Sequence, residues 1–116
     1  MKNNEFFNAM KEQENKQFTA GERNAYYAWQ TGIQNNLDFP VQNDSMFDKE
    51  VSDFLATLEK AGFQKFGYYC NSTNARQNIV DFLKAGWQLT GIFELENPFE
   101  KFGYKPDEGL VFERRF

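Results

Sequence analysis

The chain has 116 residues, the length of one ordinary domain, and its fourteen phenylalanines supply enough apolar area for a compact core. A formal net charge of −4 argues against general binding to nucleic-acid backbones, which depends on lysine and arginine. The absence of histidine excludes histidine bases and histidine metal ligands, and the single cysteine, Cys70, excludes an internal disulfide and a cysteine-cluster metal site. With no apolar run of membrane-spanning length and no signal-peptide core, the protein is expected in a reducing cytoplasm.

Two helices are predicted in the N-terminal part, residues 1–35. The first covers residues 4–17 and is weak, because its second half is wholly polar. The second begins at a capping box, in which the side chains of Thr19 and Glu22 each accept a backbone N–H from the other residue. This second helix is expected to run to about Asn35.

The second helix carries a packing stripe, and its flank has two interpretations. The stripe has the spacing of one helical face and consists of Tyr26, Trp29 and Ile33. Core packing explains the helix best. The alternative is that Tyr27 and Gln30, which lie on the flank, belong to a contact surface. A loop is predicted next, over residues 36–45.

A short phrase occurs twice in the second half of the chain and marks the end of a helix both times. The first copy is Lys60-Ala61-Gly62-Phe63-Gln64, and the second copy is Lys84-Ala85-Gly86-Trp87-Gln88. In each copy the glycine is expected to take the left-handed conformation that ends a helix, and a strand is expected to follow.

These two glycines end helices that are predicted over residues 46–61 and 74–85. Serine and threonine side chains are suitable N-caps for both helices. The proposed caps are Ser45, with Asp48 at the third helical position, and Ser72 or Thr73. Inward-facing residues follow helical spacing. They are Val51, Phe54, Leu55 and Leu58 in the first helix, and Ala75, Ile79, Phe82 and Leu83 in the second.

Three strands are predicted, over residues 64–70, 88–96 and 109–115. A strand–helix–strand order favours parallel pairing of the first two strands through a right-handed crossover. The last strand then pairs with the second as an antiparallel hairpin. The fold class is therefore α+β, a small three-stranded mixed sheet with helices packed on one face and an N-terminal helical segment. The whole chain, 1–116, is one domain, and its α-β-α-β-β core covers residues 46–116.

Alternation divides the strand at 88–96 between two faces. The first face holds Leu89, Gly91, Phe93 and Leu95, and the second, which is expected to be exposed, holds Thr90, Ile92, Glu94 and Glu96. A pair of carboxylates such as Glu94 and Glu96 can act in acid–base chemistry or bind a cation. No acidic metal loop accompanies them, so a solvated strand face is the better interpretation, and no metal or cofactor is predicted.

The predicted hairpin loop, residues 97–108, is the candidate contact site because long loops are often functional. It holds the aromatic residues Phe99, Phe102 and Tyr104 and the carboxylates Glu100, Asp107 and Glu108. Aromatic anchors ringed by charge are typical of interface hot spots. The alternative is that the same rings fold back as a lid over an open edge of the core. With Glu94 and Glu96, these residues are predicted to contact a basic surface on a protein partner.

The sequence predicts a protein that is not an enzyme. It contains no phosphate-binding loop, no dinucleotide motif and no nucleophile elbow. Lys65-Phe66-Gly67-Tyr68-Tyr69 partly matches the base-stacking strand of RNA-recognition motifs. The acidic balance of the chain argues against RNA binding, and core packing explains these aromatics better.

Two passages carry a resemblance to known proteins. One runs from Glu5 to Gly32 and includes Phe18-Thr19-Ala20-Gly21-Glu22-Arg23-Asn24, and the other runs from Ser72 to Gly91 and is completed by Gly109-Leu110-Val111-Phe112-Glu113. Together they resemble small accessory proteins of plasmids and conjugative elements in Gram-positive bacteria, a setting in which type II-A anti-CRISPR proteins are found. The resemblance implies an inhibitor in a bacterial cytoplasm that binds an RNA-guided nuclease or its guide-RNA complex.

Three functions from different classes are therefore considered. The predicted function is a non-catalytic anti-CRISPR protein, monomeric or homodimeric, that binds a CRISPR effector nuclease. The second is a regulatory or scaffold protein of a mobile element that binds another host protein. The third is a hydrolase or nuclease that uses carboxylates, and a requirement for a divalent metal would favour it.

Overall fold

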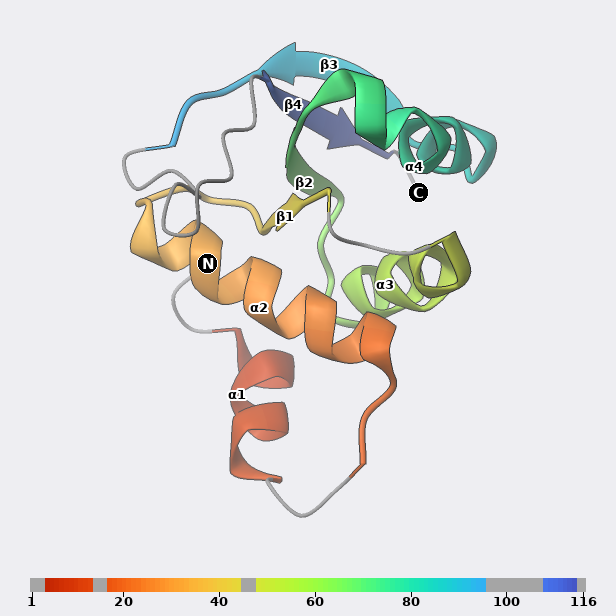
Figure 1. Cartoon of the computed structure of the whole chain (residues 1–116). Coiled ribbons are helices and arrows are strands. Elements are labelled where there is room, and N and C mark those ends of the chain that lie inside the picture. The colour runs from red at the N-terminus through yellow and green to blue at the C-terminus, as the bar shows by residue number, and fades with distance from the viewer. Residues whose placement is uncertain (1–3, 14–16, 45–47, 96–107, 115–116) are drawn as a thin grey trace.

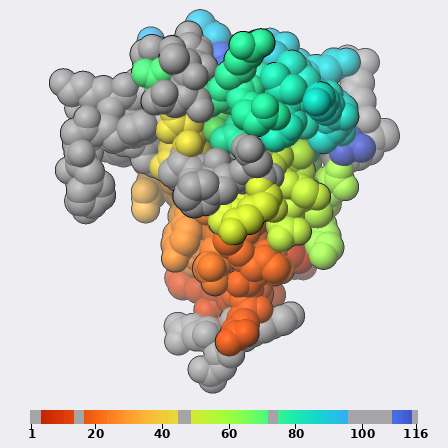
Figure 2. Space-filling model, turned by 45° about the vertical axis from the view of Figure 1, so that its right-hand side comes forward, coloured from red at the N-terminus to blue at the C-terminus, as the bar shows by residue number. Residues whose placement is uncertain are grey.

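The computed structural model describes residues 4–13, 17–44, 48–95 and 108–114. Its elements, in chain order, are α1 (Glu5–Glu12), α2 (Ala20–Gln34), β1 (Val41–Asn43), α3 (Asp48–Lys60), β2 (Lys65–Cys70), α4 (Ser72–Lys84), β3 (Gln88–Ile92) and β4 (Glu108–Glu113). Figure 1 shows β3, β4 and α4 at one end of the molecule, α2 and α3 across its middle and α1 at the other end. The surface in Figure 2 likewise has α4 at the top and α3 and α2 below it.

The sheet has four strands in the order β1-β2-β4-β3, so the fold is α+β with a mixed sheet. β4 pairs antiparallel with β3, which confirms the predicted hairpin, and it also pairs antiparallel with β2. The predicted direct pairing of residues 64–70 with 88–96 is wrong, because β4 lies between them. The reason is that β4 buries side chains on both of its faces, as interior strands do: Phe112 and Leu110 on one, Val111 on the other.

The fourth strand, β1, lies in the stretch that the sequence analysis assigned to a loop. Val41, Gln42 and Asn43 pair parallel with Gly67, Tyr68 and Tyr69 of β2. The pairing extends one residue further, because the N–H of Gly67 donates to the carbonyl oxygen of Pro40 at 2.7 Å. A strand of three residues directly after a proline is too short to show alternation, so local pattern does not reveal it.

One aromatic cluster forms the centre of the main core, between the sheet and α3 and α4. Phe66 of β2 lies at ring-centroid distances of 5.5 Å from Phe54, 5.0 Å from Phe82, 4.9 Å from Trp87 and 5.4 Å from Phe112. Aromatic pairs of this kind contribute about 0.5–1.5 kcal/mol beyond their buried area. The predicted stripe of α3 is confirmed, since Val51, Phe54, Leu55 and Leu58 are all buried.

The N-terminal helix α1 is anchored to this core by one ring. Phe7 is fully buried and stacks at 5.3 Å on Trp29 of α2 and at 6.0 Å on Phe63, which follows α3. Asn4 caps the helix through Phe7 N–H, and its side-chain amide donates to the carbonyl of Ala61 at 3.0 Å. α1 is therefore packed against α2 and against the residues that follow α3.

The predicted helix ends are confirmed in detail. The capping box joins Thr19 and Glu22 through two reciprocal hydrogen bonds of 2.9 and 3.1 Å. Gly62 and Gly86 have φ angles of 85° and 97°, the left-handed region that glycine adopts without cost. The N–H of Phe63 donates to the carbonyl oxygen of Leu58 at 2.9 Å, and the N–H of Trp87 donates to that of Phe82 at 3.1 Å. The repeated phrase therefore forms the same Schellman motif twice.

The sheet face opposite α3 and α4 carries a second, smaller apolar cluster. Phe39, Val41 and Val111 are buried there, and Phe93 packs against them. Gly67 of β2 lies under this cluster, and a Cβ added to it would lie 2.7–2.9 Å from the rings of Phe93 and Phe39. The glycine is therefore required for close approach of these two rings to the strand.

Details of α4 differ from the prediction. The helix begins at Ser72, so Ser72 and Thr73 belong to its first turn and are not its cap. The preceding residue, Asn71, donates its N–H to the carboxylate of Asp44 at 2.9 Å. Leu83 was expected to face inward but is 49% exposed. The proposed cap of α3, Ser45, lies outside the described residues.

Candidate functional site: the open edge of the sheet

Most of the predicted contact residues lie outside the described part of the chain. These are Glu96, Phe99, Glu100, Phe102, Tyr104 and Asp107. Glu108 is the first residue of β4, and Glu94 follows β3 and is exposed. Of the flank residues on α2, Tyr27 is 59% exposed, whereas Gln30 is half-buried and donates to the hydroxyl of Tyr26 at 3.0 Å.

A β-bulge in β3 changes the predicted distribution of its side chains. Leu89 pairs with Phe112 and Gly91 pairs with Val111, so Thr90 is the extra residue. Directly opposed residues of an antiparallel pair point to the same face. Leu89 therefore shares the helix-covered face with Phe112, and Gly91 points to the opposite face, contrary to the predicted grouping of Leu89 with Gly91.

The same bulge places Leu89 and Ile92 on one face. Ile92 pairs with Leu110, which belongs to the main core, so Ile92 also points to the helix-covered side of the sheet. Both side chains nevertheless lie beyond the cover of the helices, because Leu89 is 52% and Ile92 is 84% exposed. We call these two residues the edge patch. Leu83, near the C-terminal end of α4, is a further exposed leucine of the helix that contacts β3.

β3 is the last strand in the sheet order, with β4 as its neighbour in the described sheet, and all five of its residues are exposed. The N–H of Phe93 donates to Gly109 of the β4 side at 3.0 Å. Because hydrogen-bonding direction alternates along a strand, the backbone N–H and C=O of Ile92 point away from β4, toward the open edge. An extended chain laid along β3 would meet these groups and the edge patch together.

This edge lacks the charge that normally protects such strands. Proteins block their sheet edges with charged side chains, prolines, bulges or covering elements. β3 has its bulge, but residues 85–93 contain no charged residue and no proline. The nearest charges in sequence are Lys84, at the end of α4, and Glu94, which is exposed. As far as the described residues show, the edge is therefore open to another strand, with the carboxylate of Glu94 at its C-terminal end.

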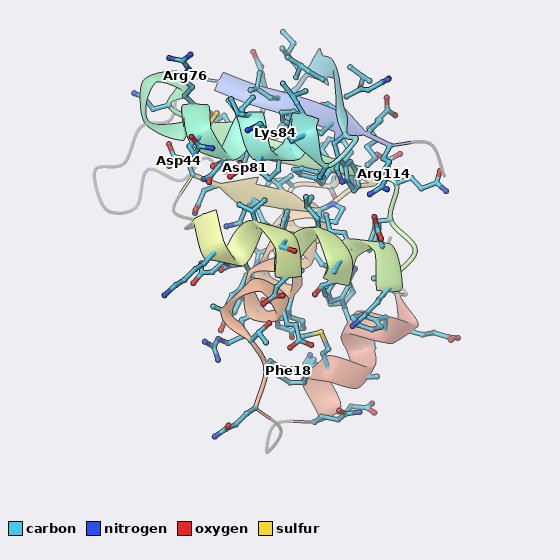
Figure 3. All side chains as sticks on the ribbon, turned by 90° about the vertical axis from the view of Figure 1, so that its right-hand side faces the viewer. Phe18, Asp44, Arg76, Asp81, Lys84 and Arg114 are labelled. Carbon is cyan, nitrogen blue, oxygen red and sulfur yellow. The ribbon has the colours of Figure 1, made fainter. Side chains whose placement is uncertain are left out.

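A second feature, a hollow of about 430 Å³, lies between α3 and α4. Glu59, Asp81 and Arg114 are among its lining residues, and Arg114 forms an ion pair with Glu59. Figure 3 labels Asp81 and Arg114 on this side of the molecule. The ion pair ties the residue after β4 to the end of α3, which is a structural role, and an exposed pair of this kind contributes about 0–1 kcal/mol.

The part of the chain that the structure describes holds neither a metal-binding cluster nor a membrane-spanning helix. Within it, no three histidine, cysteine, aspartate or glutamate side chains gather where they could hold a metal ion. None of its helices is long and apolar enough to cross a membrane. The thiol of Cys70 is buried in the main core.

The fold defines an α+β domain with a four-stranded mixed sheet in which, among the described residues, β1 is covered and β3 is exposed. The chain belongs to the family DUF7698, a domain of unknown function, whose model matches residues 24–111. The match begins within α2 and ends within β4, so it includes β1, β2 and β3 and the first four residues of β4. No curated protein and no solved structure matches the chain.

Proposed function

We propose that this protein is a non-catalytic binding protein that receives an extended segment of a partner on the open edge of β3. The observation that carries the proposal is the edge itself, since its outward backbone groups stand beside the exposed Leu89 and Ile92, and residues 85–93 carry no charged side chain. In strand addition of this kind, main-chain hydrogen bonds give affinity and alternate side chains give specificity.

The edge also indicates the chemistry of the partner segment. A segment that pairs with β3 places every second side chain over the edge patch, so those side chains are expected to be apolar. A basic side chain at the end that faces Glu94 completes the match, and the net charge of −4 favours encounter with a basic protein surface. The sequence-based contribution of Phe102 and Tyr104 remains part of the proposal as a second set of contacts.

The partner that we propose is the RNA-guided nuclease of a type II CRISPR system, free or loaded with its guide RNA. Support comes from the resemblance of residues 5–32, 72–91 and 109–113 to accessory proteins of mobile elements and from the acidic character of the chain. A nuclease that holds nucleic acid in a positively charged channel offers the basic surface that such a protein requires.

A cleavage assay with purified protein tests this proposal. The nuclease is mixed with the protein before or after guide loading, and cut target DNA is measured over a range of protein concentrations. We expect inhibition by the wild-type protein. Absence of both inhibition and direct binding at saturating protein would overturn the assignment to this nuclease.

Two substitutions at one position separate the backbone edge from its side chain. Ile92→Pro removes the outward N–H, at a position where an edge strand tolerates proline, whereas Ile92→Ala removes only apolar area. We expect the proline variant to abolish inhibition and the alanine variant to weaken it, both with unchanged melting temperature. Inhibition by Ile92→Pro equal to that of the wild type would contradict docking of the partner at β3. A wild-type homodimer that Ile92→Pro dissociates would also contradict it, because a second copy of the chain would then occupy the edge.

A further inference from the structure

A cleft of about 590 Å³ lies between α1 and α2, at the end of the molecule far from β3. Its lining residues are Met10, Lys11, Gln17, Phe18, Arg23, Tyr26 and Tyr27. Figure 3 labels Phe18 at this end, next to α1. The volume lies within the range of small-molecule sites. Most of the lining precedes residue 24, so it is outside the part of the chain that the family model matches.

One wall of the cleft is aromatic, with one fixed ring and one exposed ring. Tyr26 is held by ring contacts with Phe7 at 6.4 Å and Trp29 at 5.9 Å, and its hydroxyl accepts a hydrogen bond from Gln30. Tyr27 lies beside Tyr26 at 5.8 Å and is 59% exposed. An exposed aromatic ring next to a fixed one offers a planar ligand a face on which to stack.

Two cations line the cleft, one from each helix. Lys11 belongs to α1, and Arg23 belongs to α2. The guanidinium of Arg23 is oriented by one hydrogen bond, from Nη1 to the carbonyl of Phe18 at 2.9 Å, and its remaining N–H groups are additional donors. The nearest carboxylate on α2, Glu22, accepts the N–H of Thr19 in the capping box. A ligand with an anionic group can therefore be held between ammonium and guanidinium.

We infer that this cleft binds a nucleoside monophosphate, with its base on the aromatic wall and its phosphate between Lys11 and Arg23. The ligand needs both parts, because the wall offers stacking and the two cations offer charge-assisted hydrogen bonds. A long nucleic-acid strand is disfavoured by the net charge of −4, which repels a polyanion, whereas the two local cations balance a single phosphate group. The inference is independent of the proposed function, since the cleft and β3 lie at opposite ends of the molecule.

A calorimetric or NMR titration with AMP and UMP tests the inference, with adenosine and ribose 5-phosphate as fragments that lack one part each. We expect saturable 1:1 binding of a nucleotide, and at least about tenfold weaker binding of either fragment, the loss typical of one base stack or one ionic hydrogen bond. Tyr27→Ala and Lys11→Gln should each weaken nucleotide binding about tenfold without lowering the melting temperature.

The control variant is Arg76→Gln, which removes an exposed cation of α4 and should leave nucleotide affinity unchanged. No saturable nucleotide binding would overturn the inference. Equal affinity for an aromatic carboxylate such as phenylacetate would also overturn it, because the phosphate would then not be recognised. Tighter binding of an oligonucleotide than of the mononucleotide would identify a strand-binding surface and contradict the inference as stated.

Discussion

β1 and β3 end the same sheet, but α2 packs against β1, and β3 has no such cover among the described residues. Val41 and Gln42 of β1 are 1% and 6% exposed, although this strand has only three residues. β3 is longer, yet each of its residues is exposed. Among the described residues, the fold therefore covers one edge strand and leaves the other exposed, and this difference is the basis of the binding proposal.

The largest expected effect is the difference in free energy of unfolding between variants in the main core and a variant in the edge patch. Phe54→Ala and Phe82→Ala each remove a fully buried ring in contact with Phe66 and should lower the free energy of unfolding by about 3–5 kcal/mol. Leu89→Ala, at a half-exposed site, should cost less than about 1 kcal/mol. Denaturant melts of the three variants measure this difference, and a large loss for Leu89→Ala would show that the edge patch is part of the core.

A matched pair of glycine substitutions compares an inner strand with the edge strand. Gly67→Ala should cost about 1–3 kcal/mol, because its Cβ would press on the rings of Phe93 and Phe39. Gly91→Ala should change stability by less than about 0.5 kcal/mol, because nothing lies within 4 Å of its added Cβ. Thermal melts measure the stability of both variants. An equal loss of stability in Gly67→Ala and Gly91→Ala would show that a packed neighbour lies over β3.

A smaller effect is expected at the two helix stops. Gly62→Ala and Gly86→Ala put a Cβ on a left-handed residue and should each cost about 1–2 kcal/mol, although their surroundings have room for it. Asparagine tolerates this conformation better than alanine, so Gly62→Asn and Gly86→Asn should recover part of the loss. Equal stability of the alanine and asparagine variants would rule out backbone strain as the cause.

The parts of the fold that sequence alone predicts are those that depend on neighbours in the chain. The Thr19–Glu22 capping box, the stripe of α3 and the two glycine stops all act within a few residues, and each is confirmed. The position of β4 between β2 and β3 depends on residues far apart in sequence, and the strand–helix–strand order favoured a different pairing. β1 was missed because three residues carry no periodic signal.

The candidate site was predicted less well, for a similar reason. Glu94 was expected on an exposed face and is exposed, but the edge patch was not identified. Because Thr90 is an extra residue, Leu89 shares a face with Ile92 and not with Gly91. A prediction from strict alternation cannot reveal such an inserted residue. The signal that was available is the uncharged run over residues 85–93, which is unusual for an edge strand.

Amide hydrogen exchange over β3, with and without the guide-loaded nuclease, tests the central claim most directly. In the free protein the N–H of Ile92 points to the open edge and should exchange faster than that of Phe93, which is bonded to Gly109. If the partner adds a strand to β3, exchange at Ile92 should slow markedly on binding. A complex that forms while Ile92 still exchanges at its free rate would contradict the account.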